Sequence, residues 1–284
     1  MANTVNQPDG SSVTNTQPPG AAAAAAASVW TVEYEVDFTD QGVYDFRTTG
    51  TTRTIGGATW TAVNRTATDA DVFDFDGSTG LRINAKAGPT NNAGEWFNAT
   101  QTQPYFWATL DDMVTSSALA EDDTLCLQLE MTTTADVSSN YHRYGLGLWK
   151  NDAPGGADNF ICVSRFHNNA AYSASIAKTT EDNVGSLAQP DFFEIVSYPN
   201  GSQVVSCGVI GGGNFPDPLA TTTYKAYNAL NDLGPGDSGG SAGSPSWKIP
   251  FAKAAFVITC QVKSSTTALN STSAKMRLLR RNKS

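Results

Sequence analysis

The sequence predicts an all-β protein, an antiparallel sandwich preceded by an N-terminal arm. Three observations predict this class. Residues 29–38 alternate apolar and polar side chains without a break, further short alternating segments follow between Gly, Asn, Asp and Thr turns, and helical periodicity is almost absent. About a dozen strands separated by turn signals, with almost no helix, are typical of an antiparallel sandwich.

The N-terminal arm is predicted from composition. Residues 1–28 combine Asn, Gln, Ser, Thr and Pro with a run of consecutive alanines over residues 21–27. Such a segment buries too little apolar surface to fold alone. We therefore expect an arm over residues 1–28 and one β-sandwich domain over residues 29–284.

The first strand of the domain is predicted over residues 29–38. Its apolar side chains share one face and are Trp30, Val32, Tyr34, Val36 and Phe38. Its polar side chains share the other face and are Thr31, Glu33, Glu35 and Asp37. This period of two predicts a half-buried strand.

The other strands follow in chain order. Before residue 120 they are predicted over residues 42–48, 52–55, 59–64, 72–75, 81–85 and 105–110. After it they are predicted over residues 125–131, 144–149, 160–167, 192–198, 204–210 and 254–263. Asp76-Gly77 predicts a hairpin turn. An aromatic residue or Leu at every third position leaves a helix open over residues 222–233.

Composition argues against several partners. With 27 acidic and 18 basic residues, the net charge of -9 disfavours binding to a phosphate backbone. The sequence contains no stretch of about 18 apolar residues, so we predict no membrane span. The first 20 residues carry no Lys or Arg, so we expect no secretory leader. The last ten residues form a basic tip, which is either a solvated tail or a contact with an acidic neighbour.

The four cysteines are Cys126, Cys162, Cys207 and Cys260. No Cys-x-x-Cys pair occurs among them, and no nearby His completes a zinc set. Each lies inside an apolar or alternating segment, so we expect buried reduced thiols, with disulfides as the alternative for an exported chain. We expect neither a metal site nor a cofactor.

A hydrolase motif occurs at residues 236–240, which read Gly-Asp-Ser-Gly-Gly. A serine nucleophile at Ser238 requires a histidine base. The chain has two, His142 and His167, and both precede Ser238 in contexts unlike those of the known triads. The surrounding Gly, Ser and Pro residues are typical of a surface loop, so we expect no protease or esterase activity.

Two groups of carboxylates are candidate catalytic or metal-binding sites. Glu33, Glu35 and Asp37 resemble the acidic strand of jelly-roll glycoside hydrolases, in which retaining enzymes place two carboxyls about 5 Å apart. Their order and their place on the first strand instead favour an acidic, solvent-facing edge. Asp74 and Asp76 lack the spacing of a calcium loop and predict a tight turn.

Aromatic side chains are the candidate ligand-binding residues. Trp96, Trp107 and Trp149, with Tyr105 and Tyr141 nearby in sequence, are able to line a face on which sugars stack. The alternative is that they belong to the core. Trp149 is predicted to lie opposite the apolar face of its own strand.

Three segments carry a family resemblance. The opening strand contains Tyr-Glu-Val-Asp-Phe, residues 144–149 read Tyr-Gly-Leu-Gly-Leu-Trp, and residues 256–262 form a long strand near the end. Together they resemble the concanavalin A-like jelly rolls of lectins, laminin-G-type modules and many bacteriophage virion proteins. The Ala-rich arm is most similar to the phage members. The Asn and Asp ligands of the legume-lectin metal site do not follow Glu35 and Asp37.

The resemblance implies a function. We expect a structural virion protein without enzymatic activity, a phage capsid decoration or fibre subunit that is located in the virion and anchored by its N-terminal arm. Its partners would be capsid or other virion proteins and further copies of itself. We expect it to bind neither nucleic acid nor a membrane. The alternatives are a carbohydrate-binding, lectin-like module that contacts surface glycans and, after it, a glycoside hydrolase.

Overall fold

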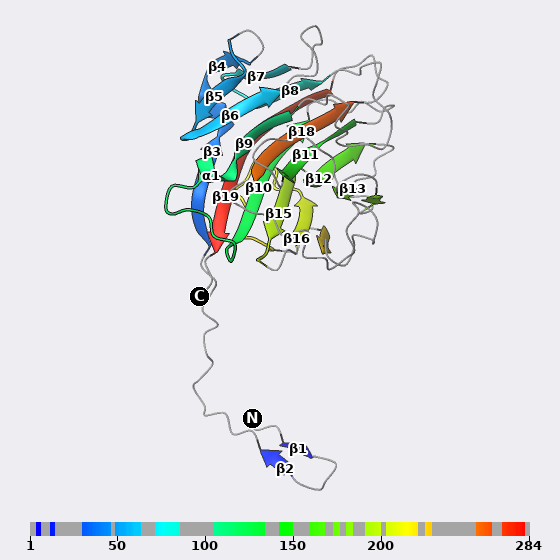
Figure 1. The fold of residues 1–284 in the computed structure, drawn as a ribbon. Coiled ribbons are helices and arrows are strands. Elements are labelled where there is room, and N and C mark those ends of the chain that lie inside the picture. Colours follow the sequence, from blue (N-terminus) through cyan, green and yellow to red (C-terminus); the bar gives the residue numbers. More distant parts are fainter. Residues whose placement is uncertain are drawn as a thin grey trace.

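The computed structural model describes most of the predicted domain. The described residues are 4–6, 12–14, 30–46, 49–63, 72–85, 105–133, 142–149, 160–167, 173–176, 180–183, 191–199, 203–220, 225–228, 254–262 and 269–281. Two antiparallel sheets pack face to face over a shared core (Figure 1). The all-β sandwich that the alternation predicted is therefore confirmed.

The first sheet, here the β19 sheet, has the strand order β17-β16-β15-β10-β19-β8-β7-β4, and β3 also pairs with β19. Its strands are β3 (Thr31–Asp37), β4 (Val43–Asp45), β7 (Val72–Asp76), β8 (Leu81–Ala85), β10 (Thr124–Thr133), β15 (Phe192–Ser197), β16 (Gln203–Gly208), β17 (Lys225–Asn228) and β19 (Leu269–Arg281). A short 3-10 helix, η1 (Phe38–Gln41), follows β3.

The second sheet, here the β18 sheet, has the order β14-β13-β12-β11-β18-β9-β6-β5. Its strands are β5 (Thr52–Ile55), β6 (Ala58–Val63), β9 (Tyr105–Thr109), β11 (His142–Trp149), β12 (Phe160–His167), β13 (Ser173–Ile176), β14 (Thr180–Asn183) and β18 (Ala255–Val262). One helical turn, α1 (Leu110–Met113), follows β9. In the arm, β1 (Thr4–Asn6) and β2 (Ser12–Thr14) pair with each other. Helices long and apolar enough to span a bilayer do not occur in the described part of the chain.

The core lies between the sheets because alternate side chains of each strand point inward. In β10, Leu125, Leu127 and Leu129 are buried against the apolar side chains of β11 and β18. An aromatic cluster fills the other part of the core, where the Trp60 and Phe106 rings stack with centroids 4.7 Å apart. Aromatic pairs of this kind contribute about 0.5 to 1.5 kcal/mol beyond the area that they bury.

Strand β19 organises the β19 sheet. It pairs with β10 on one side and, on the other, with β8 and then with β3. The basic tip is therefore not a solvated tail, and that prediction is wrong for residues 275–281. Met276 and Leu278 fill the core, whereas Arg277 and Arg280 bond to groups elsewhere in the fold.

Strand β3 departs from the predicted alternation. Its register against β19 shifts between Leu278 and Leu279, where one residue of β3 is left over. Because of this bulge Glu33 is buried at 9% exposure and Val32 is 48% exposed. The predicted acidic solvent-facing edge is wrong for Glu33.

The helix left open over residues 222–233 is not formed where the structure describes this segment. Lys225–Asn228 is strand β17, which pairs with β16. Backbone hydrogen bonds to a neighbouring strand thus override the weak period of three. The boundary between arm and domain stays a prediction.

Candidate functional site

The outer face of the β18 sheet carries two of the three predicted ligand-binding residues. In β9, Phe106 and Ala108 point to the core, so Tyr105 and Trp107 lie on the other face. In β11, Leu146 and Leu148 point to the core and Trp149 lies outside, as predicted. Trp96 and Tyr141 lie outside the described residues.

The register of three strands brings these aromatic side chains together. Val257 of β18 is the direct partner of both Trp107 in β9 and Gly147 in β11, and Ala255 is the partner of Trp149. Trp149, Ala255 and Val257 form one apolar cluster on this face, and Tyr105 and Trp107 pack against it. We call these five residues the outer aromatic cluster.

The two tryptophans differ in exposure. Trp149 is 1% exposed, so its ring is unavailable for stacking while it keeps this position. Trp107 and Tyr105 are half-buried and present part of their rings at the surface. Burial also raises the pKa of the Tyr105 hydroxyl, which is therefore neutral at physiological pH. Trp107 and Tyr105 are the members of the cluster that a ligand is able to reach.

The acidic residues of β3 lie in different environments. Ser116 donates a hydrogen bond to the buried Glu33 carboxylate at 2.8 Å, and Arg280 Nη1 lies 3.9 Å from it. Glu35 is exposed, and Asp37 accepts from the Thr39 N–H at the start of η1. The three carboxylates thus have three environments, because the bulge turns Glu33 into the protein.

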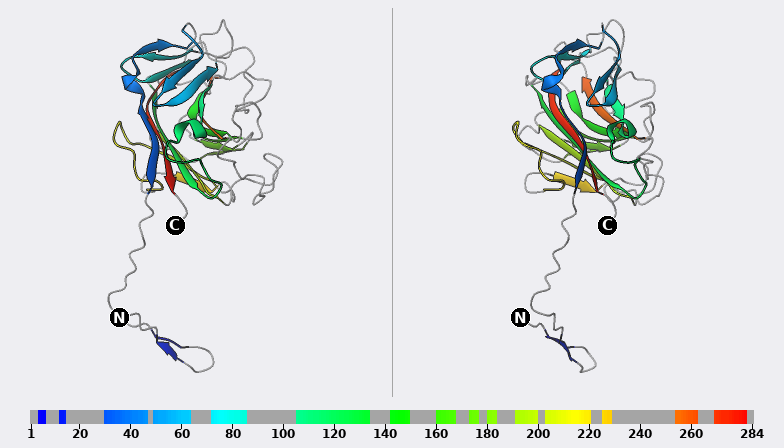
Figure 2. Two further views of the ribbon diagram at one scale, coloured as in Figure 1. Left: turned by 60° about the vertical axis from the view of Figure 1, so that its left-hand side comes forward. Right: turned by 90° about the vertical axis from the view of Figure 1, so that its left-hand side faces the viewer.

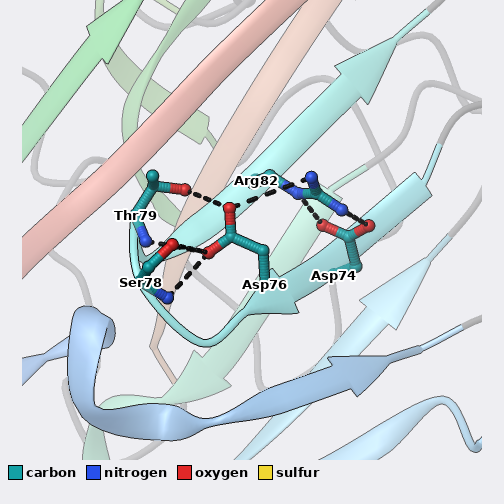
Figure 3. Close-up of polar contacts among 5 residues, drawn as sticks. All are labelled: Asp74, Asp76, Ser78, Thr79 and Arg82. Atoms are coloured by element: carbon teal, nitrogen blue, oxygen red, sulfur yellow. Dashed lines mark hydrogen bonds and ion pairs between the residues drawn. The ribbon is translucent and has the colours of Figure 1, made fainter.

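The hairpin between β7 and β8 uses its carboxylates for the turn itself (Figure 3). Asp76 accepts from the N–H and hydroxyl groups of both Ser78 and Thr79, which hold its pKa well below the usual range. Asp74 makes a bidentate pair with Arg82 at 2.7 and 2.6 Å. The predicted tight turn is confirmed.

The remaining sequence candidates are separated. Ser238 lies outside the described residues, whereas His142 and His167 are direct partners in the ladder of β11 and β12. Cys126 and Cys207 are buried free thiols, as predicted. Cys162 and Cys260 lie in β12 and β18. Within the described segments, no three His, Cys, Asp or Glu side chains are grouped so that they could hold a metal ion.

One polar row was not predicted. Gln128, Glu194 and Arg277, from three adjacent strands, lie on the outer face of the β19 sheet under residues 209–220. The signal that was available is Glu194 itself, a carboxylate in the middle of an otherwise apolar strand. A buried charge in such a place requires partners that only the fold supplies.

Comparison with known proteins supports the fold. No protein-family model matches the sequence, and no curated protein matches it. Among solved structures, an endo-1,3-β-glucanase from Streptomyces sioyaensis is 9% identical with a TM-score of 0.51, over 89% of this chain and 97% of that chain. This protein is therefore a β-sandwich with the concanavalin A-like fold.

Two further solved structures are similar at lower scores. The lectin UEA-II in complex with galactose is 10% identical with a TM-score of 0.45, over 89% of this chain and 100% of the lectin. The CBM2 module of the evolved Dit protein of Lactobacillus casei BL23 phage J-1 is 10% identical with a TM-score of 0.42, over 90% of this chain and 98% of the module. The structural neighbours thus include an enzyme, a lectin and a phage module.

Proposed function

We propose that this protein is a non-enzymatic structural subunit of a bacteriophage particle, a capsid decoration or fibre protein that is anchored by residues 1–28. The observation that carries the proposal is the pairing of β3 with β19. Thr31 at the start of β3 is the partner of Arg280 near the end of β19. The arm therefore joins the sandwich beside the end of the last strand, and Figure 1 shows both strands running to the same end. We call it the arm end.

The arm end is firmly held. Trp30 is the first described residue after the arm. The Arg281 guanidinium lies 5.2 Å from the centre of its ring. Arg280 donates to the Ser117 carbonyl and hydroxyl and pairs with Asp123. A body fixed at one end in this way presents both outer faces and its far end away from the anchor, which suits a subunit displayed on a particle.

The arm favours assembly because ordering it requires contacts with other chains. Ordering a polar segment costs roughly 1 to 2 kcal/mol per residue, and residues 1–28 have little apolar surface with which to offset that cost. Contacts with capsid proteins, other virion proteins or further copies of this chain are able to supply the difference. The place of the protein is accordingly the virion.

Deletion of residues 2–28 tests the proposal. We expect the truncated protein to remain soluble, with the circular dichroism of a folded β protein, and to be absent from particles separated by sedimentation. A matched variant with a Gly/Ser arm of the same length separates docking from spacing, and we expect it to be absent as well. Incorporation of the truncated protein at the level of the full chain would exclude the arm as the anchor.

Binding of glycans is the second candidate, favoured by the outer aromatic cluster. Trp107 and Tyr105 offer partly exposed rings that pack against the buried Trp149, Ala255 and Val257. The glucanase of similar fold acts, by its name, on 1,3-β-glucan, so this polymer is the first probe. We expect Trp107→Ala to abolish binding in a titration and Tyr198→Ala, on the other sheet, to leave it unchanged. Equal binding by both variants would exclude the cluster.

A further inference from the structure

A loop covers the outer face of the β19 sheet. Residues 209–220, here called the strap, follow β16 at Gly208 and make hydrogen bonds to side chains of β15, β10 and β19. Figure 2 shows this segment in yellow, outside the sheet. Hydrogen bonds at three places along its length hold it down.

The first part of the strap is held by two carboxylates. Asp191, just before β15, accepts from the N–H groups of Ile210 and Gly211 at 2.7 and 2.9 Å. The next N–H along the strap, that of Gly212, bonds to Glu130 of β10. Successive backbone donors thus point at acidic groups, a common arrangement for anions held by a turn.

The middle of the strap is held by a carbonyl oxygen. Pro216 O accepts from Gln128 Nε2 at 3.1 Å and from Arg277 Nη2 at 2.6 Å. The guanidinium of Arg277 also lies 5.1 Å from the centre of the Phe215 ring. Phe215 and Pro216 therefore reach as far as β19.

The last part of the strap returns to β15. The Leu219 N–H donates to Glu194 Oε1 at 3.3 Å, and the Leu219 side chain packs against Cys126, Val196 and Leu279. Leu219 adopts a φ of 61°, a left-handed conformation that is strained for a residue with a side chain. Closure of the strap therefore carries a conformational cost at this residue.

Closure also buries carboxylates. Glu194 is fully buried and is bonded by Gln128, Ser206, Cys126 and Leu219, which are all neutral donors. The charged or titratable groups around it are Cys126, Tyr198 and, through Gln128, Arg277. Glu130 faces Asp191, Asp37 and Lys275.

Burial raises the pKa of Glu194 above its ordinary value of 4.5, and burial together with the Asp191 charge raises that of Glu130. The outer face of a sheet is otherwise open to solvent, so the strap supplies much of this burial. An open strap returns both carboxylates to water and to ordinary values. Closed protein consequently binds protons more tightly than open protein does.

We propose that the strap is an acid-tightened cover, which opens and closes over the β19 sheet and whose closure is favoured by proton uptake at Glu130 and Glu194. Above the raised pKa values both carboxylates are charged and closure carries their full cost of burial. As the pH falls through those values toward the ordinary carboxyl value, the carboxylates become neutral and the cost of burying their charge disappears. The population of the closed state therefore rises. Opening uncovers Cys126, which lies beneath Leu219.

The reactivity of Cys126 in the full chain measures opening. The reagent is 4,4′-dithiodipyridine at about pH 5 and about pH 7.5, with the label at each cysteine read by peptide mass spectrometry and each rate divided by that of the unfolded chain at the same pH. Because the closed state binds protons more tightly than the open state, we expect the corrected rate at Cys126 to be several-fold lower at the acidic pH. Cys207, in the core, reports global unfolding and should react far more slowly.

Substitution identifies the groups that titrate. The double variant Glu130→Gln, Glu194→Gln should lose the pH dependence. Asp217→Asn, which neutralises an exposed carboxyl on the strap itself, should keep it. Equal corrected rates at both pH values in the unsubstituted chain, or a pH dependence that persists in the double variant, would overturn the proposal.

Amide hydrogen exchange of the unsubstituted chain covers the case in which the double variant does not fold. The Ile210, Gly211 and Leu219 amides bond to Asp191 and Glu194 and are released when the strap opens. After correction for intrinsic rates, their opening should also be several-fold less frequent at the acidic pH. Opening that is unchanged, or more frequent at acidic pH, would overturn the proposal without any variant.

Discussion

Two clusters in the β19 sheet pair one arginine with two carboxylates, and they differ in burial. At the arm end, Arg280 lies 2.7 Å from Asp123 and 3.9 Å from Glu33, and these side chains are 7, 5 and 3% exposed. In the β7–β8 hairpin, Arg82 lies 2.6 Å from Asp74 and 3.8 Å from Asp76, and these are 40, 14 and 22% exposed. The two clusters contain the same charged groups, but those at the arm end are much less exposed to water.

The difference teaches which cluster the fold depends on. Removing one partner of a buried pair leaves the other charge without water or a counter-ion, which costs about 3 to 5 kcal/mol. A partly exposed pair regains water when it is broken, and its contribution is usually about 0 to 1 kcal/mol. Arg280 therefore holds the arm end together, whereas Arg82 adds little to a turn that Asp76 already forms.

The largest effect is expected for Arg280→Ala. The carboxylates of Asp123 and Glu33 would remain buried without their cation, so the free energy of unfolding should fall by about 3 to 5 kcal/mol. Urea denaturation measures this change. The matched control is Arg281→Ala, next on the same strand, where the contact with the Trp30 ring is worth about 1 kcal/mol. A loss for Arg280→Ala no larger than that for Arg281→Ala would contradict the expected cost of leaving two buried carboxylates without their cation.

An intermediate effect is expected for Asp76→Ala, which leaves the Ser78 and Thr79 N–H groups without their acceptor. The free energy of unfolding should fall by about 1 to 2 kcal/mol at neutral pH. The pKa of Asp76 is depressed in the folded state, so its contribution is present above the unfolded value of about 3.9 and is lost as the pH falls through the depressed value. Thermal melts should converge at strongly acidic pH. A difference that stays constant down to that pH would contradict the turn-forming role of the charge.

The smallest effect is expected for Arg82→Ala, which should lower the free energy of unfolding by at most about 1 kcal/mol, because Arg82 is 40% exposed. A double-mutant cycle with Asp74→Asn measures the pair, and high salt should reduce its coupling. If the coupling approaches the loss seen for Arg280→Ala, burial is not what separates the two clusters.

The same contrast decides how far the sequence is able to predict this protein. The hairpin is predicted correctly because Asp76, Ser78 and Thr79 are near neighbours in the chain, and short-range geometry alone brings them together. The arm end is not, because Arg280 bonds to Ser117 across 163 residues and Glu33 to Ser116 across 83. Nothing near Glu33 in the sequence distinguishes it from the exposed Glu35.

The candidate ligand face shows a similar division. The alternation in β11 predicts that Trp149 lies opposite Leu146 and Leu148, and it does. Its 1% exposure was not predictable, because the burial of a residue depends on what packs over it and not on its own strand. Trp107 is more accessible than Trp149, because less of the protein packs over it.

The fold class follows from the sequence by itself, because successive side chains of a strand must point to opposite faces and the period of two is therefore written in each segment separately. The partners of β19, the bulge that buries Glu33 and the strap over Glu194 were decided by the tertiary structure. Each depends on groups brought together from distant parts of the chain, as when Arg277 meets Gln128 across 149 residues. The energy of a buried charge is set by those partners and by the exclusion of water, and neither exists until both sheets have packed.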